Sequence, residues 1–504
     1  MFDTLARLVP KDSAYPDRVW RLDVLTRVLD GTIYDTLQHE FFDEKNDAGE
    51  YIPLRKRRPS VRYNLSRLVV GDSIALLFGD GHFPSVDLAD PDEHNTLAGI
   101  LKAGRLAQVM TEAALRGSVG SVVVMMRVSK AGRVHFSCMD SRFLTPAWDA
   151  DEPDTLVSIT ERYKVRGAEL KSQGYEIAAD KLTSDFWFQR VWDTEAERWF
   201  LPVPVGQAGI APGRNFYTGV EGEQQAAPVE DTARTVKHGL GFVPMVWIKN
   251  LPGGDGIDGA STFRAAVDSQ IEIDYQLSQA GRGLKYSSDP LLMVREPAAS
   301  DDSSIISGQN ALLVSEKGDA KMLEIGGTAS QAVIEYVRTL REQALEVIHG
   351  NRSSADKISA AQSGRALEML HQALIWLTDQ LRASYGENGI LPLARMVLDA
   401  SKKYPLSVNR KKVKAFTETA EPALRWPAWF PPTGQDRTAE ANALGTLTDH
   451  ALMSRETAVK SVAASFDIED VPAELSRIAA DQAADDARAA QQAAQVKATE
   501  TLPM

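Results

Sequence analysis

The order of three segments in the middle of the chain constrains its fold more than any other feature. A long helical pattern over residues 260–283 precedes a short β-rich stretch and a second long helical pattern. The apolar residues of the first pattern recur at four-residue steps, at Phe263, Val267, Ile271 and Tyr275. A neighbouring face carries Arg264, Asp268 and Glu272. We predict an amphipathic helix of roughly 36 Å that packs on one side and stays solvated on another.

The second helical pattern covers residues 330–349 and has near-heptad spacing, carried by Val333, Val337, Leu340, Ala344 and Val347. Between the two helices, residues 290–325 predict three short strands with the sequences PLLMV, ALLVS and AKMLEI. A turn at Glu316-Lys317-Gly318-Asp319 would join the last two strands. The predicted order is therefore long helix, β insertion, long helix.

The whole chain predicts an α+β protein of two to four packing units, because 504 residues exceed what one hydrophobic core usually serves. The first hundred residues are helical in pattern, and two antiparallel β regions follow. One has a hairpin signal at Lys130-Ala131-Gly132, and the other has a polar turn at Asp193-Thr194-Glu195. Another long helix follows Gly350, and weakly apolar helices end the chain.

The charge pattern argues against a protein that grips nucleic acid. The formal net charge is −13, whereas tight binding generally rests on neutralising phosphates with Lys and Arg. We interpret the basic run RKRRPSVR at 55–62 as a solvated surface before a helix that stops at Gly79. An acidic protein can still let a polyanion pass, because it offers no deep electrostatic minimum in which the polyanion would stick.

The sequence predicts no membrane association and a reducing compartment. No apolar run is long enough to cross a bilayer, and the first twenty residues lack the apolar core of a signal peptide. The single cysteine, Cys138, rules out an intrachain disulfide framework and a multi-cysteine metal site. We interpret this cysteine as a small buried hydrophobic residue.

A glycine triplet at Gly254, Gly256 and Gly259 has the spacing of a dinucleotide-binding loop. In that fold the first glycine follows a strand directly, and a second parallel strand delivers an acid about twenty residues later. Here Asn250-Leu251-Pro252-Gly253 intervenes, and the acids at that distance lie within the predicted helix. We therefore favour a hinge between a strand and a helix over a dinucleotide-binding enzyme.

Other signals of catalysis are weak, and we expect no cofactor and no metal. The chain lacks the P-loop, H-E-x-x-H and G-x-S-x-G motifs. His349 and His371 flank one predicted loop and could pair, but surface or packing roles are favoured. The aromatic residues of RWPAWFPP, at Trp426, Trp429 and Phe430, could stack on bases, but its prolines favour a rigid packed corner.

Four stretches in a fixed order resemble the portal proteins of tailed bacteriophages, in particular those of siphophages. They are HGLGFVPMVWIKN at 238–250, DGASTFRAAVDSQIEIDYQLS at 258–278, SAAQSGRALEML at 359–370, and the long run from Trp426 to Val462. Each pattern alone is weak, but the order and the β insertion between two long helices are specific. The resemblance extends over about residues 50–485.

The resemblance implies the portal fold. Residues 1–255 would form the wing, 256–285 and 329–350 the paired stem helices around a central channel, and 286–328 the clip. Residues 351–364 would form the tunnel loop, 365–435 the long wing helix and a returning strand, and 436–504 the crown and C-terminal tail. Twelve acids and six bases in this last segment would repel packaged DNA.

The resemblance also implies a function without an active site. Portal subunits form a ring, dodecameric in the family, at a capsid vertex, through which double-stranded DNA is packaged and ejected. The implied partners are the terminase large subunit, a head–tail adaptor, the major capsid protein and the scaffolding protein, with assembly in the host cytoplasm and a final place in the virion.

Three groups of residues are the candidate sites of such a portal. The tunnel loop would present Arg352, Ser353, Ser354, Lys357, Ser359 and Gln362 to DNA. The clip would dock partners through Glu316, Lys317 and Asp319, and the stem would carry Arg264, Asp268 and Glu272. Two alternatives remain: a virion structural protein without a channel, such as a baseplate component, and the dinucleotide-binding enzyme.

Overall fold

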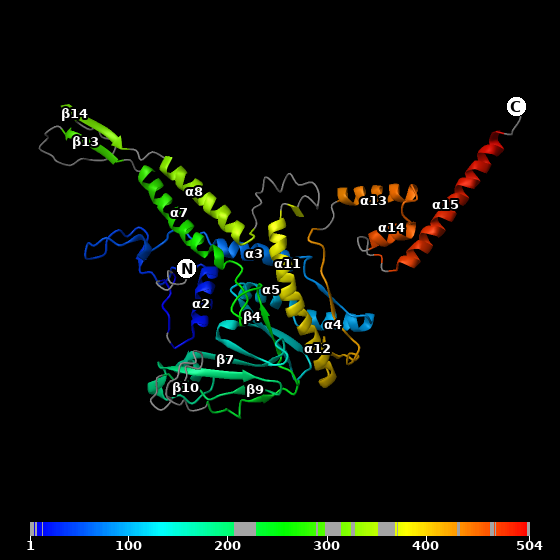
Figure 1. Cartoon of the computed structure of the whole chain (residues 1–504), viewed down its shortest axis with the longest axis horizontal. Helices are drawn as coiled ribbons and strands as arrows, with labels where there is room; N and C mark the ends of the chain where they lie inside the picture. The colour runs from blue at the N-terminus through cyan, green and yellow to red at the C-terminus, as the bar shows by residue number, and fades with distance from the viewer. Residues whose placement is uncertain are drawn as a thin grey trace. The chain divides into compact units, whose positions relative to one another are not determined.

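The computed structural model describes residues 5, 8–12, 14–205, 228–288, 291–297, 314–323, 328–350, 368–369, 371–430, 434–463, 468 and 470–500. The chain divides into two compact units. One comprises Met1–Ser353 and His371–Trp429, and the other comprises Ser354–Leu370 and Phe430–Met504. Helices and strands are mixed throughout the first unit (Figure 1), as the α+β prediction requires.

Four helices form the N-terminal part of the first unit: α2 (Asp17–Asp30), α3 (Leu65–Phe78), α4 (Pro91–Ala103) and α5 (Leu106–Gly117). Their ends follow local chemistry. The side chain of Asn64 accepts a hydrogen bond from the Arg67 amide at the start of α3, and Gly79 ends that helix, as predicted. Asp90 caps α4 in the same way, with Pro91 in its first turn.

A three-stranded antiparallel sheet lies at the centre of the first unit, in the order β12 (Met245–Lys249), β4 (Ser121–Val128), β5 (Val134–Asp140). Residues 121–126 of the middle strand are all buried, because β4 is paired on both edges. The predicted hairpin joins β4 to β5, and Gly132 takes the left-handed conformation that the turn requires.

A larger antiparallel sheet contains β6 (Leu144–Trp148), β7 (Leu156–Arg166), β8 (Asp185–Trp192), β9 (Ala196–Trp199) and β11 (Val236–Lys237), with β10 (Val203–Pro204) also paired to β8. The predicted turn between β8 and β9 is confirmed: the Asp193 carboxylate accepts hydrogen bonds from the Glu195 and Ala196 amides. Short connecting elements are α6 (Gly167–Ser172), η2 (Ser141–Phe143) and η3 (Ala179–Lys181).

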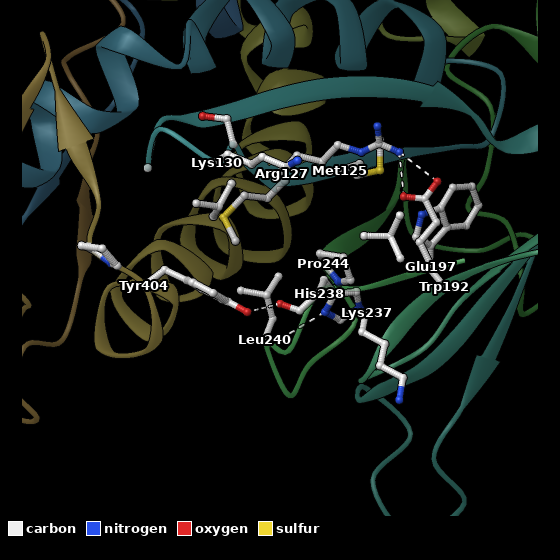
Figure 2. Close-up of a pocket in the computed structure, with 16 residues that line it drawn as sticks. Met125, Arg127, Lys130, Trp192, Glu197, Lys237, His238, Leu240, Pro244 and Tyr404 are labelled. Atoms are coloured by element: carbon white, nitrogen blue, oxygen red, sulfur yellow. Dashed lines mark hydrogen bonds and ion pairs between the residues drawn. The ribbon is translucent and has the colours of Figure 1, made fainter. Parts of the chain in front are cut away.

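A cavity of about 610 Å³ opens where the two sheets approach each other (Figure 2). Arg127 on β4 pairs with Glu197 on β9 across it, at 3.0 Å. The Tyr404 hydroxyl donates to the carbonyl oxygen of His238 at 2.5 Å. Burial lowers the pKa of His238, so this ring is neutral at physiological pH. The internal bonds of these polar groups give the cavity a structural role between the sheets.

The long helix pair has the predicted order: α7 (Val267–Ser288), β13 (Leu291–Pro297), β14 (Val314–Leu323) and α8 (Thr328–Val347). The end of α8 contacts η4 (Arg264–Ala266) at the start of α7, so the helices run antiparallel, with β13 and β14 beyond their far end (Figure 1). The predicted start at residue 260 was wrong by seven residues. The Ala260 and Thr262 amides bond to Leu251 and Ser118 carbonyls instead of entering a helix.

The predicted turn at Glu316-Lys317-Gly318-Asp319 was also wrong, because these residues lie inside β14. Pairing with β13 brings Arg295 opposite Asp319 and Val294 opposite Ala320, and the register shifts between Asp319 and Val314, which lies opposite Pro297. In the described residues of this segment there are therefore two antiparallel strands, whereas the sequence predicted three.

The helix after residue 371 is continuous through three parts: α11 (Gln372–Leu381), the π-helical stretch η5 (Arg382–Ile390) and α12 (Leu391–Lys403). Gly386 lies against Trp426, where a side chain would clash. Short strands complete the unit: β1 (His39–Glu40) with β2 (Arg57–Arg58), β15 (Ser407–Val408) with β16 (Lys411–Lys412), and β17 (Ala423–Arg425) with β3 (Ser85–Asp87). One 3₁₀ turn, η1 (Leu54–Lys56), precedes β2.

The second unit is helical, with α13 (Gly434–Asp449), α14 (Arg455–Val462) and α15 (Val471–Glu500). Residues 479–492 of α15 are exposed, which agrees with the prediction that this alanine-rich stretch buries little. Within the described residues of both units, no helix is long and apolar enough to span a membrane.

Candidate functional site: the stem helices and their anchor

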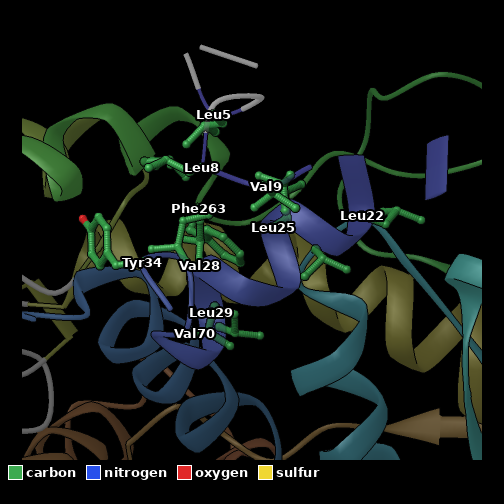
Figure 3. Close-up of a cluster of buried hydrophobic side chains, with 14 residues drawn as sticks. Leu5, Leu8, Val9, Leu22, Leu25, Val28, Leu29, Tyr34, Val70 and Phe263 are labelled. Atoms are coloured by element: carbon green, nitrogen blue, oxygen red, sulfur yellow. The ribbon is translucent and has the colours of Figure 1, made fainter. Parts of the chain in front are cut away.

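We call α7 and α8 the stem. The predicted apolar face of α7 packs on the N-terminal helices: Phe263 and Val267 are fully buried in a cluster with α2 residues such as Leu25 and Val28 (Figure 3). Ile271 and Tyr275 pack against the same cluster. The predicted polar set, Arg264, Asp268 and Glu272, is exposed. The structure therefore brings these three side chains together on the solvated face of the stem, and their role in a channel stays a prediction.

Three polar side chains of α7 lie within its buried face, one turn apart. Gln270, Asp274 and Ser278 are each at most 2% exposed. We call them the polar ladder. The Gln270 amide oxygen accepts from the Ser66 amide at 2.9 Å, and the Asp274 carboxylate accepts from the Tyr63 amide at 2.7 Å. The Ser278 hydroxyl accepts from the Val61 amide at 3.0 Å.

The polar ladder satisfies backbone groups that have no strand partner. Residues 59–64 run extended between β2 and α3, outside any sheet, and an unpaired amide buried there would cost about 1–3 kcal/mol. The side chains of α7 replace the missing strand, at the spacing that a helix dictates. Two directed bonds, from the Tyr63 and Val61 amides, therefore fix the stem to the segment before α3, and a third, from the Ser66 amide, fixes it to the first turn of α3.

Asp274 is the chemically most perturbed member of the ladder. Burial raises its pKa to about 6, although the Tyr63 amide, the Tyr34 hydroxyl and the Arg62 guanidinium act in the opposite direction. The Tyr34 hydroxyl donates to the second carboxylate oxygen at 2.9 Å, and Arg62 forms an ion pair with Asp35. Burial also raises the pKa of the adjacent Tyr275 to about 12. The carboxylate therefore accepts two hydrogen bonds without an ion pair of its own among the described residues.

The second stem helix is held through its C-terminal half. Arg341 donates from Nε to the Tyr63 hydroxyl at 3.0 Å, so Tyr63 contacts both stem helices. Ala344, Leu345 and Ile348 are buried. The predicted stripe was wrong at Val347, which is 60% exposed, because the straight 3.6-residue helix turns that position out of the face.

The glycine triplet lies in a loop in which the Asp255, Asp258 and Gly259 amides donate hydrogen bonds within the chain. Gly254 and Gly256 have φ angles of +102° and +88°, which favour glycine. The Gly259 amide donates to the Gly120 carbonyl at 3.2 Å, and the Ala260 amide donates to the Leu251 carbonyl at 2.9 Å. Because β12 before the loop pairs antiparallel with β4, no parallel strand unit is built there. This geometry supports the hinge and opposes the dinucleotide interpretation.

Asp258 in this loop forms an ion pair with Arg18, and we call this pair the arginine lock. Arg18 on α2 binds both carboxylate oxygens of Asp258, at 2.6 and 2.9 Å. It also donates to the Leu144 and Ser141 carbonyl oxygens. Both side chains are largely buried, and they border a cavity of about 520 Å³. The lock joins α2, the larger sheet and the entry to α7.

Trp426 and Trp429 lie in a packed corner, as the sequence predicted. Trp426 stacks on Phe78 with ring centroids 6.3 Å apart. The Arg382 guanidinium lies over the Trp426 and Trp429 rings, at 4.7 and 3.2 Å from their centroids. Burial lowers the pKa of Arg382 to about 10. These ring faces are already engaged, so they do not offer a platform for bases.

Several predicted positions contribute no site geometry. The six tunnel-loop residues, Arg352, Ser353, Ser354, Lys357, Ser359 and Gln362, lie outside the described residues. Glu316, Lys317 and Asp319 lie within strand β14. Across the described part of the chain, no group of three or more His, Cys, Asp or Glu side chains could hold a metal ion. Burial raises the pKa of the Cys138 thiol to about 12, which fits a packed residue rather than a nucleophile.

The described residues of the first unit form a mixed α+β body with a long antiparallel helix pair and a β tip. The family model for the phage portal protein, SPP1 Gp6-like, matches residues 10–488. The chain therefore belongs to this family of portal proteins, which are structural components of the bacteriophage virion. The resemblance predicted from the sequence is confirmed.

Two further comparisons, with solved structures and with curated sequences, give no evidence about function. A chain in the solved structure of a virion of a native gene transfer agent particle is similar over 92% of this chain and 97% of that chain, with 10% sequence identity and a TM-score of 0.42. A TM-score of this size supports no conclusion about function. A comparison with curated protein sequences found no match.

Proposed function

We propose that copies of this chain close into a ring at one capsid vertex and that double-stranded DNA passes through the ring during packaging and ejection. Membership of the portal family over residues 10–488 is the observation that carries this proposal. The stem supplies the physical means. Its helices of 22 and 20 residues can line a central passage if copies stand side by side about one axis.

The surface of the stem supports ring formation. In the single chain, Leu284 on α7 and Ile334, Tyr336 and Val347 on α8 are about half exposed or more. Ile334 and Tyr336 are two residues apart and so point to nearly opposite sides of α8. A head-to-tail contact that repeats around an axis covers such residues in every copy and leaves no open end.

The charge of the chain suits a conduit for DNA. Asp268 and Glu272 are exposed acids on the stem, and the chain as a whole carries a net charge of −13. Acidic walls repel phosphates and so prevent a moving duplex from binding tightly. Arg352 and Lys357 of the tunnel loop would give brief, sequence-independent phosphate contacts, beside Ser353, Ser354, Ser359 and Gln362.

The proposed ring also implies binding partners. The β13–β14 tip, with Glu316, Lys317 and Asp319 on β14, would dock the terminase large subunit during packaging and the head–tail adaptor afterwards. The terminase would supply the energy of ATP hydrolysis. The body would contact the major capsid and scaffolding proteins as a ring of twelve assembles in the host cytoplasm.

A packaging assay tests the channel directly. Arg352→Ala combined with Lys357→Ala should lower the DNA content of filled heads while rings still form. Lys411→Ala combined with Lys412→Ala removes two exposed cations of β16 and is the matched control. Unchanged packaging with the first pair would refute the tunnel-loop role. Heads that fill normally without the chain would favour the alternative of a virion structural protein with no channel.

A further inference from the structure

A short arm projects from the base of the stem. We define the arm as residues 41–56, between β1 and β2. The Asn46 amide bonds to the Glu50 carbonyl and the Ile52 amide to the Glu44 carbonyl, which folds the arm back on itself. At its base the buried Arg57 guanidinium donates to the carbonyl oxygens of Ile52 at 2.8 Å and Phe41 at 3.3 Å.

The arm is fixed to α7. The Tyr275 hydroxyl donates to the Arg57 carbonyl oxygen at 2.9 Å, and Glu44 forms an ion pair with Arg282. Four residues after Arg57, the Val61 amide donates a hydrogen bond to Ser278 of the polar ladder. The arm is therefore held in place before any partner arrives, which lowers the entropic cost of binding.

Three of the five large apolar side chains of the arm are exposed. Only Phe41 and Ile52 of its large apolar side chains are buried, whereas Tyr51 is 66% exposed, Phe42 is 54% exposed and Leu54 is also exposed. The Arg57 guanidinium lies over the Tyr51 ring, 5.0 Å from its centroid. Rigid aromatic side chains of this kind are enriched at the centres of protein interfaces.

Two cations border this apolar surface. Arg55 and Lys56 are exposed and, within the part of the chain that the structure describes, neither forms an ion pair. They are part of the run that the sequence analysis interpreted as wholly solvated, and Arg57 in the same run is fully buried. The arm therefore presents an aromatic surface with a basic edge, which fits an apolar partner with an acidic edge.

One face of α8 has that chemistry. Tyr336 is 48% exposed and Val347 is 60% exposed. Because they are eleven residues apart, they point in nearly the same direction, about 16 Å apart along the helix. Glu335 and Glu342 are exposed roughly a third of a turn around the helix from these two residues, still on the solvent-facing side of α8. The ion pair of Arg338 with Glu342, at 3.4 Å, is exposed to solvent and contributes little.

We propose that the arm of one copy packs on this face of α8 in the neighbouring copy, with Arg55 and Lys56 opposite Glu335 and Glu342. Within one chain the bonds of the arm to the stem go to α7, and this face of α8 stays in solvent. A head-to-tail ring brings one side of each copy against the other side of the next, so the two surfaces meet. This inference rests on the proposed ring.

Disulfide trapping tests the contact. We would introduce Tyr51→Cys with Tyr336→Cys, and separately Tyr51→Cys with Val347→Cys, and oxidise purified rings at pH 8. All variants would carry Cys138→Ser, because the native thiol is only partly buried. At least one pair should give a ladder of cross-linked multimers on a non-reducing gel. Leu201→Cys with Tyr336→Cys places an exposed thiol in another part of the wing and should give none.

The outcomes separate the two proposals. Rings that show no ladder with either pair would overturn the arm contact and leave the ring intact. If the wild-type chain forms no ring under any condition, the proposed function fails, and the arm contact fails with it.

A charge swap provides a second readout. Arg55→Glu with Lys56→Glu should raise the subunit concentration needed for half-assembly by about fivefold to thirtyfold, which corresponds to the loss of two interface ion pairs worth about 1–2 kcal/mol together. Glu335→Lys with Glu342→Lys should do the same. Combining all four substitutions should restore assembly, and losses that simply add would contradict the pairing.

Discussion

Replacing Asp274 by Asn should make the first unit more stable at neutral pH, although Asp274 accepts two buried hydrogen bonds. The asparagine oxygen can accept from the Tyr63 amide, and its N–H can donate to the Tyr34 oxygen, so both contacts survive. What the substitution removes is a buried negative charge. Because each pKa unit corresponds to about 1.36 kcal/mol, moving the pKa from 3.8 to about 6 disfavours the carboxylate by about 3 kcal/mol.

The sign of the pH dependence follows from that shift. The folded chain binds the Asp274 proton more tightly than the unfolded chain, so the stability from this group is fully present below about pH 4 and is lost as pH rises through about 6. The asparagine variant has no such loss. We expect it to exceed the wild type by about 3 kcal/mol in free energy of unfolding at pH 8 and by about 1 kcal/mol at pH 4.5.

Urea unfolding of unassembled subunits, followed by tryptophan fluorescence, measures this difference. All nine tryptophans lie in the first unit, so the signal reports that unit alone. Asp268→Asn removes the same charge from an exposed position of α7 and should change the unfolding free energy by less than about 0.5 kcal/mol. A destabilised Asp274→Asn variant, or a difference that does not change with pH, would refute the reasoning.

Three other substitutions test the packing around the stem. Arg18→Ala leaves the buried Asp258 carboxylate unpaired and should cost about 3–5 kcal/mol, and adding Asp258→Asn should recover part of the loss in the same urea assay. Gly259→Ala would place a methyl group 2.7 Å from the Asn250 amide nitrogen, so we expect a loss of about 2–4 kcal/mol. Gly281→Ala, in open space on α7, should instead gain about 0.5–1 kcal/mol.

The sequence predicts the stem well because its signals are local. The four-residue apolar spacing from Phe263 to Tyr275 places those side chains in the core, and the polar residues beside them are exposed. The β4–β5 hairpin and the end of α3 at Gly79 follow from turn and cap residues in the same way. Four sequence stretches in a fixed order, with the β insertion between two long helices, indicated the portal family.

The polar ladder could not be predicted, because its spacing is also that of a solvated helix face. Asp274 and Ser278 accept hydrogen bonds from amides of the segment before α3, and Gln270 accepts one from the first turn of α3, so the burial of these side chains depends on partners about 200 residues away in the sequence. Its one sequence signal is that the three positions fall within the arc of the apolar stripe. The Arg57 carbonyl oxygen likewise accepts from Tyr275, and the part of β14 from Asp319 onward pairs with β13, so both depend on partners distant in the sequence.

Imaging of the purified full-length chain tests the central claim most directly. Class averages of negatively stained particles should show closed rings with a central hole wide enough for a DNA duplex, about 20 Å across, if the stems of many copies surround one axis. Compact single subunits, or open chains of subunits without a hole under every assembly condition, would contradict the account.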